Sequence, residues 1–216
     1  DRSGEEVIHL IDAISTNVTS FFRESAHFDF LAKVVAEWRA RGQQRFRFWS
    51  AASSTGEEPY SMAITLLEAL GRSDSDVKIL ATDISTRVLE KCRAGEYKQD
   101  RMQSVPPLLR DRYFDCERHG HETVYVAKPA LKRMITFTRI NLAEPPFPMQ
   151  GPFDAVFCRN VMIYFDNTVR SNLLAEIYRL VKPRGYLFVG HAESLTGMMS
   201  SFKTVEPSVY IKDTVK

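Results

Sequence analysis

The segment from Phe46 to Ser61, FRFWSAASSTGEEPYS, limits the possible folds more than any other part of this sequence. A short apolar run leads into small residues, which are followed by Gly56, two glutamates and Pro59, a residue that suits the first turn of a helix. Apolar side chains then recur at helical spacing. A strand, a tight turn and a helix in this order predict an α/β sheet, in which ligands bind beyond the carboxyl ends of the strands.

The turn after the first predicted strand narrows the choice of ligand. It lacks both the Gly-Lys-Ser/Thr ending of a phosphate loop and the G-x-G-x-x-G pattern of a dinucleotide site. Glu57 and Glu58 stand there instead, and two carboxylates repel polyanions but suit an ammonium or sulfonium group. Asp83 follows Gly56 by 27 residues and ends the second apolar segment, where an acid typically accepts hydrogen bonds from a ribose. These features favour a nucleoside with a cationic tail, and S-adenosylmethionine is the common one.

The rest of the chain predicts further strands and helices of the same sheet. Residues 153–158 form a nearly continuous apolar run, which is typical of a parallel strand buried on both faces. Residues 96–112 are polar and interrupted by two prolines, so we predict short helices or loop there. Alternation around residues 123–127 predicts a small antiparallel β-subdomain at about 113–130. The remaining predicted helices lie at about 5–14, 26–41, 85–94 and 167–181, and the remaining strands at 134–138, 186–190 and 208–212.

Charge and cysteine usage exclude several classes of function. Lys plus Arg number 29 and Asp plus Glu 27, a net charge of +2 without a block of like charge, so no nucleic-acid partner is expected. No run reaches membrane-spanning length and no signal peptide is visible. The three isolated cysteines indicate reduced thiols in a cytosolic protein. Cys116, His119 and His121 could bind a metal, but a solvated hairpin loop explains them better, and we predict no metal.

Several polar residues have two interpretations when they are taken one at a time. Arg23 reads as a charge at a helix end, Asn160 as a turn residue and Tyr164 as part of the core, and composition alone favours these structural roles. His191 and Glu193 follow a predicted strand, and a strand-end turn explains them as well as a site does.

Six motifs occur in one order along nearly the whole chain. They are TNVTSFFRE at 16–24, WSAASSTGEEPYS at 49–61, ATDI at 81–84, GPFD at 151–154, FCRNVMIYFD at 157–166 and GHAES at 190–194. Together they resemble the chemotaxis protein methyltransferases of the CheR type. The resemblance implies a Rossmann-like, S-adenosylmethionine-dependent methyltransferase in residues 25–216. Its implied activity is methyl esterification of glutamate side chains on the cytoplasmic helices of chemoreceptors.

The resemblance also implies roles for single residues. It implies that Tyr164 lies beside the transferring methyl group, and that Arg23 or Arg159 holds a carboxylate of the cofactor or the substrate, so we predict Arg23 and Tyr164 as catalytic residues. The residues implied to contact the cofactor are Asn17, Thr19, Arg23, Glu58, Asp83, Asn141, Leu142, Arg159 and Asn160.

Two departures from the family pattern bear on partners. The N-terminal helical domain that helps family members engage the receptor is expected to be largely absent, with residues 1–24 forming a linker or remnant. Some members grip a receptor C-terminal pentapeptide with the β-subdomain. Here Gly120 is the one glycine of the corresponding loop, which weighs against such tethering. Two alternative functions stay open: a cofactor-binding interaction module without turnover, and a methyltransferase of the same fold for another carboxylate or a small molecule.

Overall fold

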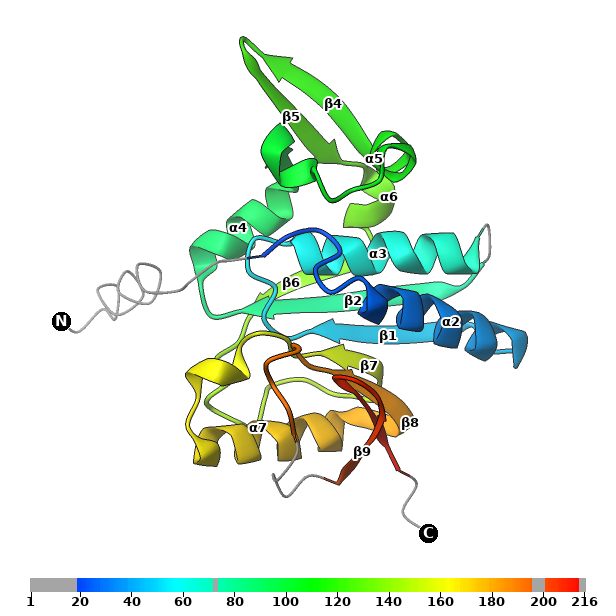
Figure 1. Cartoon of the computed structure of the whole chain (residues 1–216), viewed down its shortest axis with the longest axis vertical. Helices are drawn as coiled ribbons and strands as arrows, with labels where there is room; N and C mark the ends of the chain where they lie inside the picture. Colours follow the sequence, from blue (N-terminus) through cyan, green and yellow to red (C-terminus); the bar gives the residue numbers. More distant parts are fainter. Residues whose placement is uncertain (1–18, 72–73, 196–200, 214–216) are drawn as a thin grey trace, which may run out of the picture.

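The computed structural model describes residues 19–71, 74–195 and 201–213, and its centre is a seven-stranded sheet (Figure 1). The strand order is β6-β2-β1-β7-β8-β10-β9. The bounds are β1 Arg45–Ser50, β2 Asp76–Asp83, β6 Ile135–Arg139, β7 Phe153–Phe157, β8 Val181–Phe188, β9 Phe202–Glu206 and β10 Val209–Lys212.

The connections reverse direction at the middle of this sheet. β1 pairs in parallel with β2 on one side and with β7 on the other. β6 and β8 extend the parallel part, and β10 is antiparallel to both β8 and β9. Because the two halves of the sheet grow outward from β1 and β7, a ligand site is expected beyond the carboxyl ends of these two strands.

Each face of the sheet carries its own hydrophobic core, because side chains of a strand alternate between the faces. Phe48 packs in the core under α2 (Ala26–Ala40) and α3 (Glu57–Leu70), whereas Trp49 packs in the core under α7 (Asn167–Leu180). Figure 1 shows α2 and α3 on one side of the sheet and α7 on the other. All five residues of β7 are buried, as its apolar sequence predicted.

The ends of the helix predicted at 85–94 are determined by two neighbouring residues, Ser85 and Gly95. The Ser85 hydroxyl accepts a hydrogen bond from Val88 N at 3.2 Å, which caps α4 (Thr86–Ala94) at its start. Gly95 ends the helix with a left-handed φ of 61°, a conformation that costs glycine little. The predicted helices at 26–41 and 167–181 are also confirmed as α2 and α7.

A second, three-stranded antiparallel sheet stands apart from the main one and forms the predicted β-subdomain (Figure 1). The predicted hairpin is confirmed as β4 (Phe114–His119) and β5 (Glu122–Ala127). The sequence did not predict β3 (Glu96–Lys98) or β9, and it placed the start of β8 five residues too late. The short helices η1 (Gln99–Met102) and α5 (Pro107–Tyr113) lie between β3 and β4, and α6 (Pro129–Lys132) lies between β5 and β6.

Phe21 joins the segment before α2 to the β-subdomain. Its side chain is 1% exposed, and its ring meets those of Tyr97 and Phe114 edge-on, with centroids 4.8 and 5.6 Å apart. Part of the expected linker is therefore core. The expected helical remnant at 5–14 lies outside the described residues. Within the described ranges, no helix is both long enough and apolar enough to cross a membrane.

We predict that Phe21→Ala lowers the free energy of unfolding by roughly 3–5 kcal/mol, because it removes a buried aromatic side chain and leaves a cavity. Urea denaturation checks this value. Leu108→Ala is the control, since Leu108 is 80% exposed and its loss should cost less than about 0.5 kcal/mol. Equal stability of the two variants would show that Phe21 does not pack into the core.

Candidate functional site

The carboxyl ends of four parallel strands lie side by side at one edge of the main sheet. Three backbone hydrogen bonds connect the segments that leave β1, β2, β7 and β8. They run from Ala51 N to Phe157 O at 2.8 Å, from Ser53 N to Thr82 O at 2.9 Å and from Cys158 N to Phe188 O at 2.9 Å. Asp83 is the last residue of β2, Glu58 lies in the first turn of α3, and Arg159 and Asn160 follow β7, so the fold brings these predicted site residues to one edge.

Arg159 is the centre of a buried ion cluster. Its Nη1 donates to Glu58 Oε2 at 3.0 Å, and its Nη2 donates to Glu24 Oε2 at 3.0 Å and to the carbonyl oxygen of Arg23. Ser50 Oγ donates to the second oxygen of Glu58 at 2.7 Å. The guanidinium of Arg159 is thus committed to carboxylates of this chain. Glu24 was not predicted as a partner of Arg159, although it directly follows Arg23 in the first motif.

The two carboxylates of this cluster differ in their pKa. Burial raises the pKa of Glu24, but the hydrogen bond and charge of Arg159 outweigh burial, and the net pKa lies below the ordinary value. Burial dominates at Glu58 and holds its pKa above the ordinary value despite Arg159. Glu58 is therefore a carboxylate whose ionised form would be favoured by a further positive charge.

Side chains of the β-subdomain hold the loop between β1 and α3 in place. Arg101 of η1 pairs with the buried Glu57, with Nε donating to Oε1 at 3.1 Å. Tyr97 OH donates to Thr55 O at 3.0 Å. A Cβ on Gly56, whose φ is 98°, would lie 2.6 Å from that hydroxyl, so glycine is required there. Glu57 therefore neutralises a cation that comes from the β-subdomain.

Asp83 ends β2 beside this loop. Its Oδ2 accepts from Ser54 N at 2.8 Å and its Oδ1 from Ser85 N at 3.0 Å. The backbone N of Ile140 donates to Asp83 O at 3.1 Å, which places the next two residues, Asn141 and Leu142, near the end of β2. Leu142 is buried, and Asn141 accepts from Ala143 N through its side chain at 3.1 Å.

Tyr164 does not belong to the core. It ends the 3-10 helix η2 (Met162–Tyr164) after β7, and its side chain is 62% exposed. Arg23 is half-buried in the turn before α2, and Thr19 is the first described residue. Asn17 lies outside the described residues.

Residues with a strained backbone gather around this edge of the sheet. Of six described non-glycine residues with positive φ, Ser54 and Asn160 lie in the loops after β1 and β7, at 47° and 57°, and Phe22 and Glu24 lie in the turn before α2, at 53° and 57°. Such conformations cost of the order of 1–3 kcal/mol each and concentrate at functional sites, where the surrounding structure enforces them.

Three possible metal ligands, Glu24, His27 and His191, lie close together here. They are not the residues that the sequence analysis considered for a metal. The His27 Nδ1 and His191 Nε2 atoms lie 3.5 and 3.9 Å from Glu24 Oε2. Burial, with help from the charge of Arg159, lowers the pKa of His27 to about 4 and keeps it neutral at pH 7. The same Glu24 oxygen accepts from Arg159, whose charge opposes a bound cation. Cys116 and His121 are exposed on the distant hairpin, and we assign no metal to either group.

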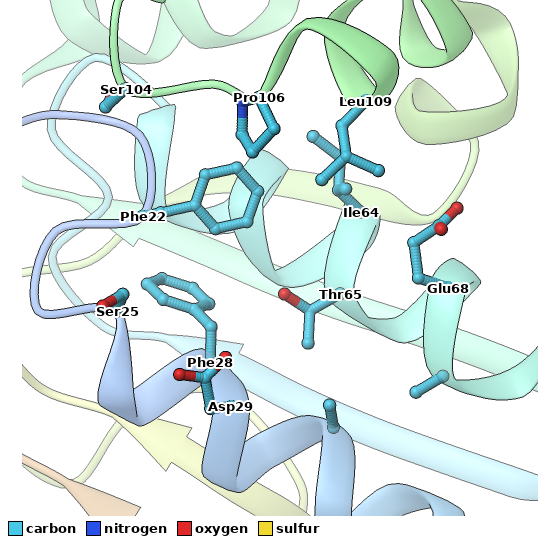
Figure 2. Close-up of a pocket in the computed structure, with 12 residues that line it drawn as sticks. Phe22, Ser25, Phe28, Asp29, Ile64, Thr65, Glu68, Ser104, Pro106 and Leu109 are labelled. Atoms are coloured by element: carbon cyan, nitrogen blue, oxygen red, sulfur yellow. The ribbon is translucent and has the colours of Figure 1, made fainter.

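A cavity of about 530 Å³ lies elsewhere, between α2, α3 and the segment around Pro106 (Figure 2). Phe22, Phe28 and Leu109 contribute apolar side chains to its wall. Glu68 lies at its edge and accepts from Arg112 at 2.7 Å. None of the described residues predicted for the site lines this cavity, so it is a separate feature of the α2–α3 face.

Comparison with known proteins decides the family. The family described as CheR methyltransferase, SAM binding domain, matches residues 17–211. This chain belongs to the CheR methyltransferase family. The predicted family, the α/β methyltransferase fold and the cofactor S-adenosylmethionine are therefore confirmed, as is S-adenosylmethionine-dependent methylation in chemotaxis as the class of activity.

Curated relatives match over most of this CheR domain. The chemotaxis protein methyltransferase of Salmonella typhimurium is 44% identical over 200 residues, 93% of this chain and 68% of that protein. The Escherichia coli protein of that name is 41% identical over the same shares, and chemotaxis protein methyltransferase 2 of Pseudomonas aeruginosa is 41% identical over 97% of this chain and 75% of its own. A putative O-methyltransferase structure from Nostoc punctiforme covers 74% of this chain and 36% of its own with a TM-score of 0.42 and 14% identity, too low to support a conclusion.

We predict that Arg159→Met lowers the free energy of unfolding at pH 7 by roughly 3–5 kcal/mol, because two desolvated carboxylates lose their cation. Without Arg159 the folded-state pKa of Glu24 rises above its unfolded value, and the pKa of Glu58, which is already raised, rises further. A raised carboxyl pKa gives stability at low pH that is lost as pH rises. The deficit should therefore shrink from pH 7 to pH 5 in urea titrations.

Arg179→Met is the matched control, since Arg179 binds the buried Glu176 but is itself half-exposed. Its deficit should be below about 1 kcal/mol. A deficit of Arg159→Met that grows on acidification would contradict the assignment of both carboxylates to one cation.

Proposed function

We propose that this CheR domain is a protein-glutamate O-methyltransferase that esterifies glutamate side chains on the cytoplasmic helices of methyl-accepting chemoreceptors. The observation that carries the proposal is the convergence of Glu58, Asp83 and Asn160 at the strand ends of a chain from this family. We further propose that the protein acts in the cytoplasm, where those receptor helices lie.

The donors and acceptors at the strand ends suit S-adenosylmethionine. Asp83 supplies a carboxylate at the end of β2, where a ribose diol would bind. Glu58 supplies a buried carboxylate with a raised pKa, which an ammonium group would compensate. Leu142 offers an apolar surface for a base. The further proposed cofactor contacts are Asn17, Thr19, Arg23, Asn141, Arg159 and Asn160.

The structure changes how we interpret Arg159 within this proposal. Its guanidinium is already bound by Glu24 and Glu58, so it acts on the cofactor by holding Glu58 in place. The family pattern remains the ground for proposing that Arg23 contacts a carboxylate of the cofactor or the substrate. The fork of N–H groups on Arg23 can bind a carboxylate in two places at once.

The proposed reaction depends on the alignment of the reacting atoms more than on proton transfer. A glutamate with a pKa of about 4.3 is already ionised at neutral pH, so its oxygen can attack without a general base. The cofactor supplies an activated methyl group, and the protein must hold oxygen, carbon and sulfur in line. Positioning of this kind can contribute on the order of 7–11 kcal/mol. We propose that Arg23 orients the substrate carboxylate and that Tyr164 presents its ring and hydroxyl beside the methyl group.

A receptor C-terminal peptide is the further candidate partner, and β4 is the strand it would pair with. β4 lies at an edge of the small sheet, where a peptide can add as a strand through backbone hydrogen bonds. The single glycine of the adjoining turn, Gly120, weighs against this mode, so the helical substrate region is the primary partner proposed.

We predict that the protein binds S-adenosylhomocysteine and transfers radiolabelled methyl groups to a receptor fragment with exposed glutamates, in a bond that mild base cleaves. Calorimetry and a methyl-transfer assay on the full-length protein with its own receptors measure the two steps. Binding without transfer would identify a cofactor-binding interaction module, and base-stable label would identify a different acceptor chemistry.

We predict that Asp83→Ala raises the Kd for S-adenosylhomocysteine roughly ten- to hundredfold, because charged hydrogen bonds are worth about 1.5–3 kcal/mol. Asp76→Ala is its control at the opposite end of β2. Tyr164→Phe should instead lower kcat with Kd within about twofold, and Tyr178→Phe on α7 is its control. Similar small effects at Asp83 and Asp76 would remove Asp83 from the cofactor site.

A further inference from the structure

Glu193 accepts hydrogen bonds from four backbone N–H groups, three of which belong to the segment after β7. The side chain is 5% exposed and lies just beyond β8. Its Oε2 accepts from Asn160 N at 2.6 Å and Gly190 N at 2.8 Å. Its Oε1 accepts from Met162 N at 2.7 Å and Ile163 N at 3.3 Å. One buried carboxylate therefore determines the path of the chain from Asn160 to η2.

Gly190, just beyond the end of the neighbouring strand β8, leaves room for the side chain of Asn160. A Cβ at position 190 would lie 2.4 Å from Asn160 Nδ2 and 2.8 Å from Glu193 Oε2. The amide of Asn160 thus occupies the space that any other residue at 190 would fill. Asn160 itself has a left-handed φ of 57°, which is strained for a residue with a side chain.

The same loop carries two apolar side chains that face solvent. Ile163 is 45% exposed and Tyr164 is 62% exposed. Side chains with this much exposure bury too little surface to fix their own backbone. The hydrogen bonds to Glu193 add to the order that the buried side chain of Met162 gives this segment, and charge-assisted bonds of this kind are stronger than neutral ones.

We infer that Glu193 is a positioning residue for methyl transfer: its carboxylate sets the loop that presents Asn160 to the cofactor and Tyr164 to the methyl group. The inference rests on the proposed function, because Asn160 and Tyr164 receive their roles there. Glu193 binds backbone N–H groups of its own chain and not the ligand. Its loss should therefore move the loop after β7 without removing a charge that faces the ligand.

The test compares Glu193→Gln with Glu176→Gln in the full-length protein. Glu176 is a matched control, since it is 8% exposed and accepts a backbone hydrogen bond from Phe147 N at 3.0 Å, away from the strand ends. Glutamine keeps the shape of the side chain but replaces one acceptor oxygen with a donor that faces N–H groups. We expect Glu193→Gln to raise the Kd for S-adenosylhomocysteine at least tenfold and to lower kcat at least tenfold, with the KM for the receptor fragment within twofold.

Glu176→Gln should leave all three quantities within twofold of wild type, even where the two variants lose equal thermal stability. Equal stability losses with unchanged Kd and kcat in Glu193→Gln would overturn the inference and leave Glu193 a structural residue. A wild-type protein that neither binds S-adenosylhomocysteine nor methylates the receptor fragment would overturn the proposed function instead.

Gly190→Ala decides the case if Glu193→Gln does not fold. The added Cβ displaces the Asn160 side chain and also crowds Glu193 Oε2, while the carboxyl group itself is kept. We expect a Kd for S-adenosylhomocysteine at least tenfold higher, because Asn160 leaves the cofactor. An unchanged Kd would contradict the role given to this loop.

Discussion

The structure depends most on the ion cluster around Arg159. A buried guanidinium is costly unless hydrogen bonds and opposite charges surround it. Here the chain meets that requirement with two carboxylates, Glu24 and Glu58, which lie 135 and 101 residues away in sequence. The turn before α2, the first turn of α3 and the loop after β7 are therefore held in one arrangement before any ligand arrives. Preorganised charge of this kind is what an alignment-based reaction requires.

Much of the fold could be predicted from the sequence because its signals are local. The apolar run of β7 and the Ser85 and Gly95 ends of α4 can be recognised from neighbouring residues alone. β3 could not be recognised, since three residues are too short to show alternation and their partner strand is distant. β9 has four exposed residues of five, so its sequence reads as loop.

The position of the candidate site at the strand ends could be expected from the sequence, but the pairing of its side chains could not. The strand-end rule placed Glu58 and Asp83 at one edge from sequence alone. Which carboxylate binds Arg159 depends on tertiary distance, and nothing in the composition around Glu24 encodes it. Glu193 stayed ambiguous for a different reason: its partners are backbone N–H groups, which every residue except proline carries, so the contact leaves no mark on neighbouring residue types.

The β-subdomain is an insertion whose two ends meet, since Ala127 N donates to Gly95 O at 2.8 Å. Protein engineers often shorten such excursions to a tight turn. In this fold the shortened chain would keep its main sheet, but the buried carboxylate of Glu57 would lose its cation, because Arg101 is removed with the insertion. The carbonyl of Thr55 would likewise lose its donor from Tyr97. A minimal version of this enzyme therefore has to retain the insertion or replace both of these supports.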